Sequence, residues 1–260
     1  MNAMRAELGK HEINFGGVGA IMVALFIAAP APGASLLIEQ SSPYLDYGYG
    51  LGYWTGTTAA LNSAFGAGNI TVNATPLNDL TYLMSFDSLW ITPTQPGDLG
   101  LTSTEIANVQ AFIASGRRVA LIGENSSWAA WNNSILSIVG GSYNGIDTSA
   151  TLTPVIVNDL TVGIASLATV FDGVASGGTP LFSENVATLW GASQNVLSLL
   201  SVNVLDDGTG AAAGDIQFKI NLANWLAASV PEPSAAALTG LGLLLVTRTR
   251  RRQSSVVTGS

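Results

Sequence analysis

Three acidic residues lie at the ends of predicted strands, where open α/β sheets commonly carry functional residues. Glu39, Glu124 and Asp206 each end or follow an apolar run that is typical of a buried strand, and the carboxyl ends of parallel strands meet at one edge of such a sheet. Two carboxylates at a suitable separation hydrolyse glycosidic bonds. The other interpretation, which we favour, is that acids after strands cap helices or lie in solvated turns.

Aromatic residues form a second group with possible chemistry. The loop after the first predicted strand interleaves glycines with four tyrosines, Tyr44, Tyr47, Tyr49 and Tyr53. Trp128 and Trp131 follow the strand that ends at Ile122, so both groups crowd one edge of the sheet if the two strands are neighbours. Tyrosine and tryptophan stack on sugar rings through apolar faces with polar rims. Alternatively the tryptophans, Trp54 included, are core residues, which we favour for them, while both interpretations stay open for the tyrosines.

The composition excludes several other chemistries. The chain has no cysteine, so it has neither disulfides nor a thiolate nucleophile. Its one histidine, His11, lies in a segment that we expect to be removed. The run 206–210 lacks the alternating acids and terminal glutamate of a calcium loop, so we interpret it as a turn. We therefore predict no metal and no cofactor.

The elements that position these residues alternate along the chain. Strands are predicted over 36–39, 69–74, 88–92, 118–123, 151–157, 179–182, 186–190 and 196–205. Helices are predicted to begin near Trp54, at Thr102 with Glu105 completing a capping box, near Trp128 and at Asp215. The last helix is expected to bury Ile216, Ile220, Ala223 and Leu226. Continuous apolar strands alternating with helices predict a single α/β domain with a mainly parallel sheet, covered on both faces.

Part of the chain resembles a known superfamily. The segments 87–93, 101–116 and 120–124, with 202–204 and 221–226 near the end, are similar to the core of class I glutamine amidotransferase-like proteins. The resemblance implies a flavodoxin-like, doubly wound sheet. Catalytic members carry a cysteine after a core strand and a later histidine, and both are absent from residues 35–229. Amidotransferase activity is therefore not expected.

Charge and hydropathy divide the chain into a translocated middle and two ends. Arg5 and Lys10 precede an apolar run over 15–29 and small residues over 30–34, which predicts a signal peptide over residues 1–34. Residues 35–229 hold fourteen acids against three bases, a net charge of about −11, whereas the other six basic residues flank the apolar ends. This partition predicts export of the middle. Its acidity excludes nucleic acid as a partner, because phosphate binding needs basic side chains.

The last predicted segment has the order of a sorting signal. Val230 and the motif Pro231, Glu232 and Pro233 precede an uncharged stretch of fourteen residues, 234–247, which is short for a membrane-spanning helix. A basic cluster follows, made of Arg248, Arg250, Arg251 and Arg252. Residues 230–252 resemble the PEP-CTERM sorting domain of exported bacterial proteins, with 253–260 as a tail. The resemblance implies that an exosortase recognises Pro231, Glu232 and Pro233.

Together these patterns predict the cellular location of a bacterial protein more clearly than its activity. We expect signal peptidase and an exosortase-type enzyme as partners, and transient anchoring in the inner membrane by a short transmembrane helix. The final location is then the cell surface or the extracellular matrix. The PEP-CTERM resemblance implies association with exopolysaccharide and biofilm material. We favour a non-enzymatic, polysaccharide-binding protein over an enzyme. The alternative is a carboxylate-dependent hydrolase acting on envelope glycans.

Overall fold

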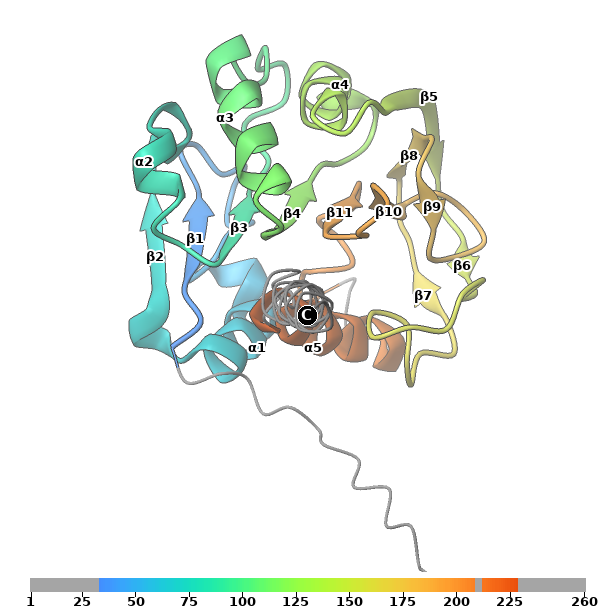
Figure 1. The fold of residues 1–260 in the computed structure, drawn as a ribbon. Helices are drawn as coiled ribbons and strands as arrows, with labels where there is room; N and C mark the ends of the chain where they lie inside the picture. The colour runs from blue at the N-terminus through green and yellow to red at the C-terminus, as the bar shows by residue number, and fades with distance from the viewer. Residues whose placement is uncertain (1–32, 209–211, 229–260) are drawn as a thin grey trace, which may run out of the picture.

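The computed structural model describes residues 33–208 and 212–228 (Figure 1). The predicted sorting segment, and all but the last two residues of the predicted signal peptide, lie outside this range. Within it, no helix is both long and apolar enough to cross a membrane. The account below therefore concerns the predicted mature domain.

A seven-stranded, mostly parallel sheet forms the centre of the fold, in the order β2-β1-β3-β4-β11-β10-β9. Its strands are β1 (Leu36–Glu39), β2 (Ile70–Asn73), β3 (Ser88–Ile91), β4 (Arg118–Ile122), β9 (Thr179–Pro180), β10 (Ala187–Trp190) and β11 (Val196–Leu199). The five strands from β2 to β11 pair in parallel, and β10 and β9 continue the sheet by antiparallel pairing. The predicted α/β class and mainly parallel sheet are confirmed.

Helices cover both faces of this sheet (Figure 1). The α-helices are α1 (Thr55–Phe65), α2 (Leu80–Leu83), α3 (Ser103–Ala114), α4 (Ala129–Ser137) and α5 (Ala213–Ala227), with short 3-10 turns η1 (Gly52–Trp54), η2 (Ala67–Asn69), η3 (Pro76–Asn78) and η4 (Ser126–Trp128). Alternate side chains of a strand point to opposite faces. Leu36 and Ile38 accordingly pack in the core under α1 and α5, whereas Leu37 packs in the core under α3 and α4.

Local sequence signals specify several of these elements correctly. The capping box at the start of α3 is formed in full, with Thr102 and Glu105 each bonding the other's backbone amide. Such a box satisfies two amide donors that the first helical turn leaves unpaired. Trp131 and Ile135 of α4 are buried, as their spacing predicted. The helical periodicity was therefore sufficient for the helices that pack against a purely apolar surface.

The buried face predicted for α5 is correct for Ala223 and Leu226, each 1% exposed, and wrong for the two isoleucines. Ile216 and Ile220 are 49% and 42% exposed. The buried stripe runs instead through Asp215, Phe218, Lys219, Leu222 and Leu226. Two charged residues belong to this stripe because the fold supplies partners for both: the Asp215 carboxylate accepts from the Ala168 amide, and the Lys219 ammonium contacts Asp206 and Asp207. A prediction that excludes charges from the core cannot place such a stripe.

The second half of the domain also departs from the predicted strands. The run 196–205 is a strand only to Leu199, and 151–157 only to Leu152. Leu200, Val204 and Leu205 are nevertheless buried, because the chain after β11 turns within the core. Two small antiparallel sheets were not expected: β5 (Ser142–Thr148) with β8 (Asp172–Ser176), and β6 (Thr151–Leu152) with β7 (Leu167–Ala168).

The beginning of β1 and the end of α5 lie at the same edge of the sheet. The Ser35 amide donates to the Asp87 carboxylate, next to the first residue of β3. The Ser88 hydroxyl donates to the carbonyl of Leu226, close to the end of α5. This amino edge is opposite the edge at which Glu39 ends β1.

Candidate functional site

An open hollow of about 350 Å³ lies at the carboxyl edge of the parallel strands. It is lined by the loops after β1 and β3, the turn after β4 and the segment after β11. The residues are Tyr44, Tyr47, Pro96, Glu124, Asn125, Ser127, Trp128, Val202 and Asn203. We call it the aromatic hollow. Its place follows from the fold, since ligands of open α/β sheets bind outside the carboxyl ends of the strands.

Aromatic rings make one wall of the hollow. Tyr44 and Tyr47 lie parallel, with ring centroids 6.2 Å apart and an interplanar angle of 2°. The edge of Tyr44 meets Trp128 with centroids 5.0 Å apart, and Tyr53 continues the stack at 4.9 Å from Tyr47. The structure thus brings together three of the four predicted tyrosines and one tryptophan. The fourth, Tyr49, donates its hydroxyl to Asn62 of α1 instead.

The aromatic groups come together as predicted, but not because their strands are neighbours. The first strand and the strand ending at Ile122 are not neighbours, because β3 lies between them. The aromatic groups still meet, because the loop after β1 extends across the end of β3 to reach Trp128. Trp54, Trp128 and Trp131 are all core residues, 1%, 6% and 2% exposed, as the favoured interpretation held, and Trp128 also lines the hollow.

Glu124 lies at the floor of the aromatic hollow and is only 2% exposed. Its Oε2 accepts from the Val202 amide at 2.6 Å, and its Oε1 accepts from the Asn125 side chain at 3.2 Å. Burial, and after it the charge of Asp172, raise the pKa of Glu124 well above its usual range. A carboxyl whose pKa is raised in this way is suited to donating a hydrogen bond or a proton.

Asp172, the first residue of β8, is the partner that the sequence did not reveal. It is fully buried, and burial raises its pKa to about 7. The Asn203 amide donates to Asp172 at 3.4 Å and approaches Glu124 at 3.5 Å, so it bridges the two acids. The only signal in the sequence is an aspartate inside an otherwise uncharged stretch, next to Phe171 and Gly173.

Asn132 of α4 holds the turn that carries Glu124. This fully buried side chain accepts from the Glu124 amide at 3.0 Å and donates to the carbonyls of Glu124 and Asn125. Gly123 permits the contact, because a Cβ atom there would lie 2.4 Å from Asn132 Oδ1. Asn132 is therefore a positioning residue, and nothing in its sequence context distinguishes it from the exposed Asn133.

The other two predicted carboxylates lie elsewhere. Glu39 lines a separate cavity, because its position in β1 directs it, like Leu37, to the face covered by α3 and α4. Asp206 is buried in the turn after β11, where its Oδ1 accepts from the Gly208 amide at 2.8 Å. Asp206 still acts on the hollow at a distance: after burial, the charges of Asp206 and Glu124 raise the pKa of Tyr47.

Comparisons with known proteins relate the chain to others by fold. No protein-family model and no curated protein sequence matches it. The mmIFT52 N-terminal domain superposes with a TM-score of 0.56 at 12% identity, over 75% of this chain and 97% of that one. At this identity the likeness shows a shared α/β fold and nothing of the activity.

Two further structures are more distant. A ThuA-like protein from Bacteroides uniformis has a TM-score of 0.47 at 10% identity, over 78% of this chain and 94% of that one. Alpha-L-fucosidase isoenzyme 2 from Paenibacillus thiaminolyticus has a TM-score of 0.42 at 12% identity, over 73% of this chain and 32% of that one.

The arrangement is suited to holding a neutral, hydroxyl-rich ligand. Ring faces of Tyr44 and Tyr47 supply apolar contact area, and Asn125, Ser127 and Asn203 supply hydrogen bonds beside them. In the part of the chain that the structure describes, no group of three acidic or histidine side chains is placed to hold a metal ion.

Proposed function

We propose that the chain is an exported bacterial surface protein that is sorted through Pro231, Glu232 and Pro233 by an exosortase-type enzyme. The order of motif, apolar stretch and arginine cluster supports this, as does the concentration of positive charge at the two ends. Signal peptidase would release residues 1–34, and the inner membrane would hold the protein only until sorting to the surface or matrix. The domain between is a flavodoxin-like, doubly wound one, which the order β2-β1-β3-β4-β11 supports.

The activity that we propose for this domain is non-catalytic binding of exopolysaccharide in the aromatic hollow. The observation that carries it is the wall of Tyr44, Tyr47 and Trp128 beside a polar floor at the carboxyl edge of the sheet. Aromatic faces bind the apolar faces of sugar rings, and the surrounding amides and hydroxyls bind their hydroxyl groups. A volume of about 350 Å³ is at the small end of ligand sites. Because the hollow is open, it fits a short stretch of a longer polysaccharide chain.

Loss of the Tyr44 ring is expected to weaken this binding. The Tyr44→Ala variant should bind host exopolysaccharide about tenfold more weakly, since one stacking ring contributes about 1 kcal/mol beyond its buried area. Tyr44→Phe should bind nearly as the parent protein does. Affinity electrophoresis in gels containing the polysaccharide measures the change.

The matched control is Tyr82→Ala, because Tyr82 packs on Phe86 away from the hollow. Equal retardation of the parent protein and Tyr44→Ala would contradict the proposed binding site. Equal weakening by Tyr82→Ala would show that the loss reflects destabilisation of the domain.

Sorting makes a separate prediction about mass. Protein recovered from the surface of its host should lack everything after the region of Pro231, Glu232 and Pro233, but only when the exosortase is present. Intact-mass spectrometry of the protein from both strains checks this. A C-terminus that extends to Ser260 in both strains would contradict sorting while leaving the binding proposal untouched.

One observation favours the hydrolase as a second candidate. Glu124 lines the hollow and its pKa is raised, which is the condition of a general acid in glycoside hydrolysis. Release of reducing ends from the bound polysaccharide separates the two functions. Release that disappears in Glu124→Gln would support the hydrolase, whereas binding without release supports the binder.

A further inference from the structure

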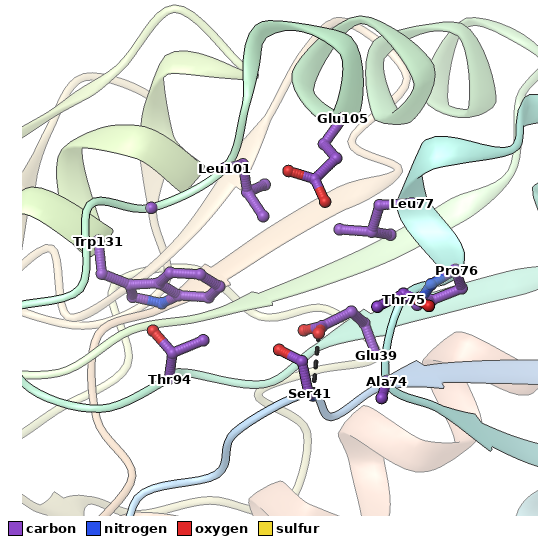
Figure 2. A pocket seen from close by; sticks show the side chains of 11 residues that line it. Glu39, Ser41, Ala74, Thr75, Pro76, Leu77, Thr94, Leu101, Glu105 and Trp131 are labelled. Carbon is purple, nitrogen blue, oxygen red and sulfur yellow. Dashed lines mark hydrogen bonds between the residues drawn. The ribbon is translucent and has the colours of Figure 1, made fainter.

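A second cavity, of about 200 Å³, lies on the other side of the carboxyl edge. It is lined by Glu39 at the end of β1, by η3, by the loop after β3 and by residues of α3 and α4. Figure 2 shows Glu39 and Glu105 directed towards one space from β1 and α3, with Thr94 and Trp131 at its other end. We call it the Glu39 cavity. The Glu39 cavity and the aromatic hollow share no lining residue, so substitutions can address them separately.

The Glu39 cavity contains buried polar atoms without a protein partner. Glu39 is 4% exposed, and its Oε1 accepts from the Ser41 amide at 3.0 Å. Its Oε2 has no hydrogen-bond partner, and neither has the buried hydroxyl of Thr94. A buried polar group without a hydrogen-bond partner destabilises the folded protein. Two such atoms at one cavity therefore indicate a place where a bound molecule completes the hydrogen bonds.

The charges around the cavity favour a positively charged ligand over a negatively charged one. Glu39 and Glu105 are its titratable lining groups, and no basic side chain lines it. The Glu105 carboxylate is already held by Thr102 and by the Asn78 side chain, so Glu39 is the acid with a free oxygen. An anion would face two carboxylates, whereas a cation gains a counter-ion in a site of low dielectric.

The rest of the lining limits the body of the ligand. Leu77 and Trp131 are almost fully buried, and Pro76 and Leu101 complete an apolar wall opposite the acid. The volume equals that of about six or seven water molecules. Both features suit a short alkyl chain and leave no room for an oligosaccharide or a peptide.

We propose that the Glu39 cavity binds small primary amines as their ammonium ions. The ammonium group donates to Glu39 Oε2 and to the Thr94 hydroxyl, and the alkyl chain packs against Leu77, Leu101 and Trp131. Burial, followed by the charge of Glu105, raises the pKa of Glu39 to about 7, with the Ser41 hydrogen bonds opposing that rise. Binding of a cation favours the ionised acid, so affinity increases as the pH rises towards about 8.

The test compares n-butylammonium with butan-1-ol, which has the same chain length and no charge, by titration calorimetry of the full chain. Butylammonium should bind the parent protein, and Glu39→Gln should weaken its binding at least about tenfold, because the amide cannot act as a counter-ion. Leu101→Phe should weaken it as well by filling the cavity. Asp98→Asn is the matched control, since this exposed acid of the loop after β3 lies outside the cavity lining and should leave the affinity unchanged.

Four results would overturn the proposal. Three of them are the absence of butylammonium binding to the parent protein, equal binding by parent and Glu39→Gln, and butan-1-ol binding as tight as butylammonium. The first would mean that the cavity holds water alone. A parallel loss in Asp98→Asn would equally overturn it, by showing general attraction to an acidic surface. None of these results affects polysaccharide binding in the aromatic hollow, so the two proposals fail separately.

Discussion

Raising the pH from about 4.5 to about 8 is expected to destabilise the domain by several kcal/mol. Four buried acids favour their protonated forms. Burial raises the pKa of Glu39 and of Asp172 to about 7 and that of Asp215 to about 6, and it raises the pKa of Glu124 as well. An acid whose pKa is higher in the folded than in the unfolded chain stabilises the fold fully below its unfolded value, near pH 4. That stability is lost as the pH rises through the folded value.

The loss from Asp172 alone is on the order of 4 kcal/mol, a large part of the stability of an ordinary domain. Asp207 acts in the opposite direction, because hydrogen bonds from Thr55 and Gly56 and the charge of Lys219 outweigh its partial burial and lower its pKa. Its contribution is lost only below about pH 4. Maximum stability is therefore expected near pH 4 to 5, on the acidic side of neutral.

Urea unfolding at several pH values measures this dependence. Asp172→Asn keeps the size of the side chain and removes its titration, so the fall in the free energy of unfolding between about pH 4.5 and 8 should become clearly smaller. The exposed Asp98→Asn should leave the fall unchanged. A free energy that rises with pH, or an identical slope in the parent protein and Asp172→Asn, would contradict the assigned burial of these acids.

The second large effect is expected at Asn132. Asn132→Ala removes one acceptor and one amide group that together satisfy the Glu124 amide and the carbonyls of Glu124 and Asn125. Since each buried group left unpaired costs about 1–3 kcal/mol, the free energy of unfolding should fall by about 3–5 kcal/mol. Binding of polysaccharide should fall as well, because the turn that forms the floor of the aromatic hollow loses its anchor.

Asn133→Ala is the natural control, because Asn133 is the next residue of α4 and is exposed. Its loss should cost about 1 kcal/mol or less. Urea unfolding of both variants, with affinity electrophoresis for binding, provides the comparison. Near-equal stability of the two variants would show that the Glu124 turn holds its conformation without Asn132.

The sequence predicted most accurately what depends on neighbouring residues. The capping box of α3 and the parallel strands that follow apolar runs were correct. The face of α5 was wrong only at Ile216 and Ile220, because the helix buries Asp215 and Lys219 instead. Asp215 accepts from the Ala168 amide, 47 residues away along the chain, and Lys219 contacts Asp207 in the turn after β11. Burial of a charge depends on such partners, and no local pattern shows them.

The same distinction applies to the candidate site. Tyr44, Tyr47 and Glu124 were accessible to prediction because the ends of strands in an α/β sheet are known gathering points. Asp172 was not, because it belongs to β8, which pairs with β5 outside the main sheet. Asn203 links it to Glu124 in the folded protein. Nor did the sequence show that alternation along β1 would direct Glu39 away from Glu124.

The position of the two described ends has a consequence for how the domain would be mounted. Ser35 and Leu226 both bond to residues at the start of β3, so the start of β1 and the end of α5 share the amino edge. The aromatic hollow opens at the opposite edge. Attachment through either end would therefore leave the edge that carries the aromatic hollow facing away from the attachment point. A polysaccharide bound at Tyr44 and Tyr47 would then lie on the side of the domain away from its attachment.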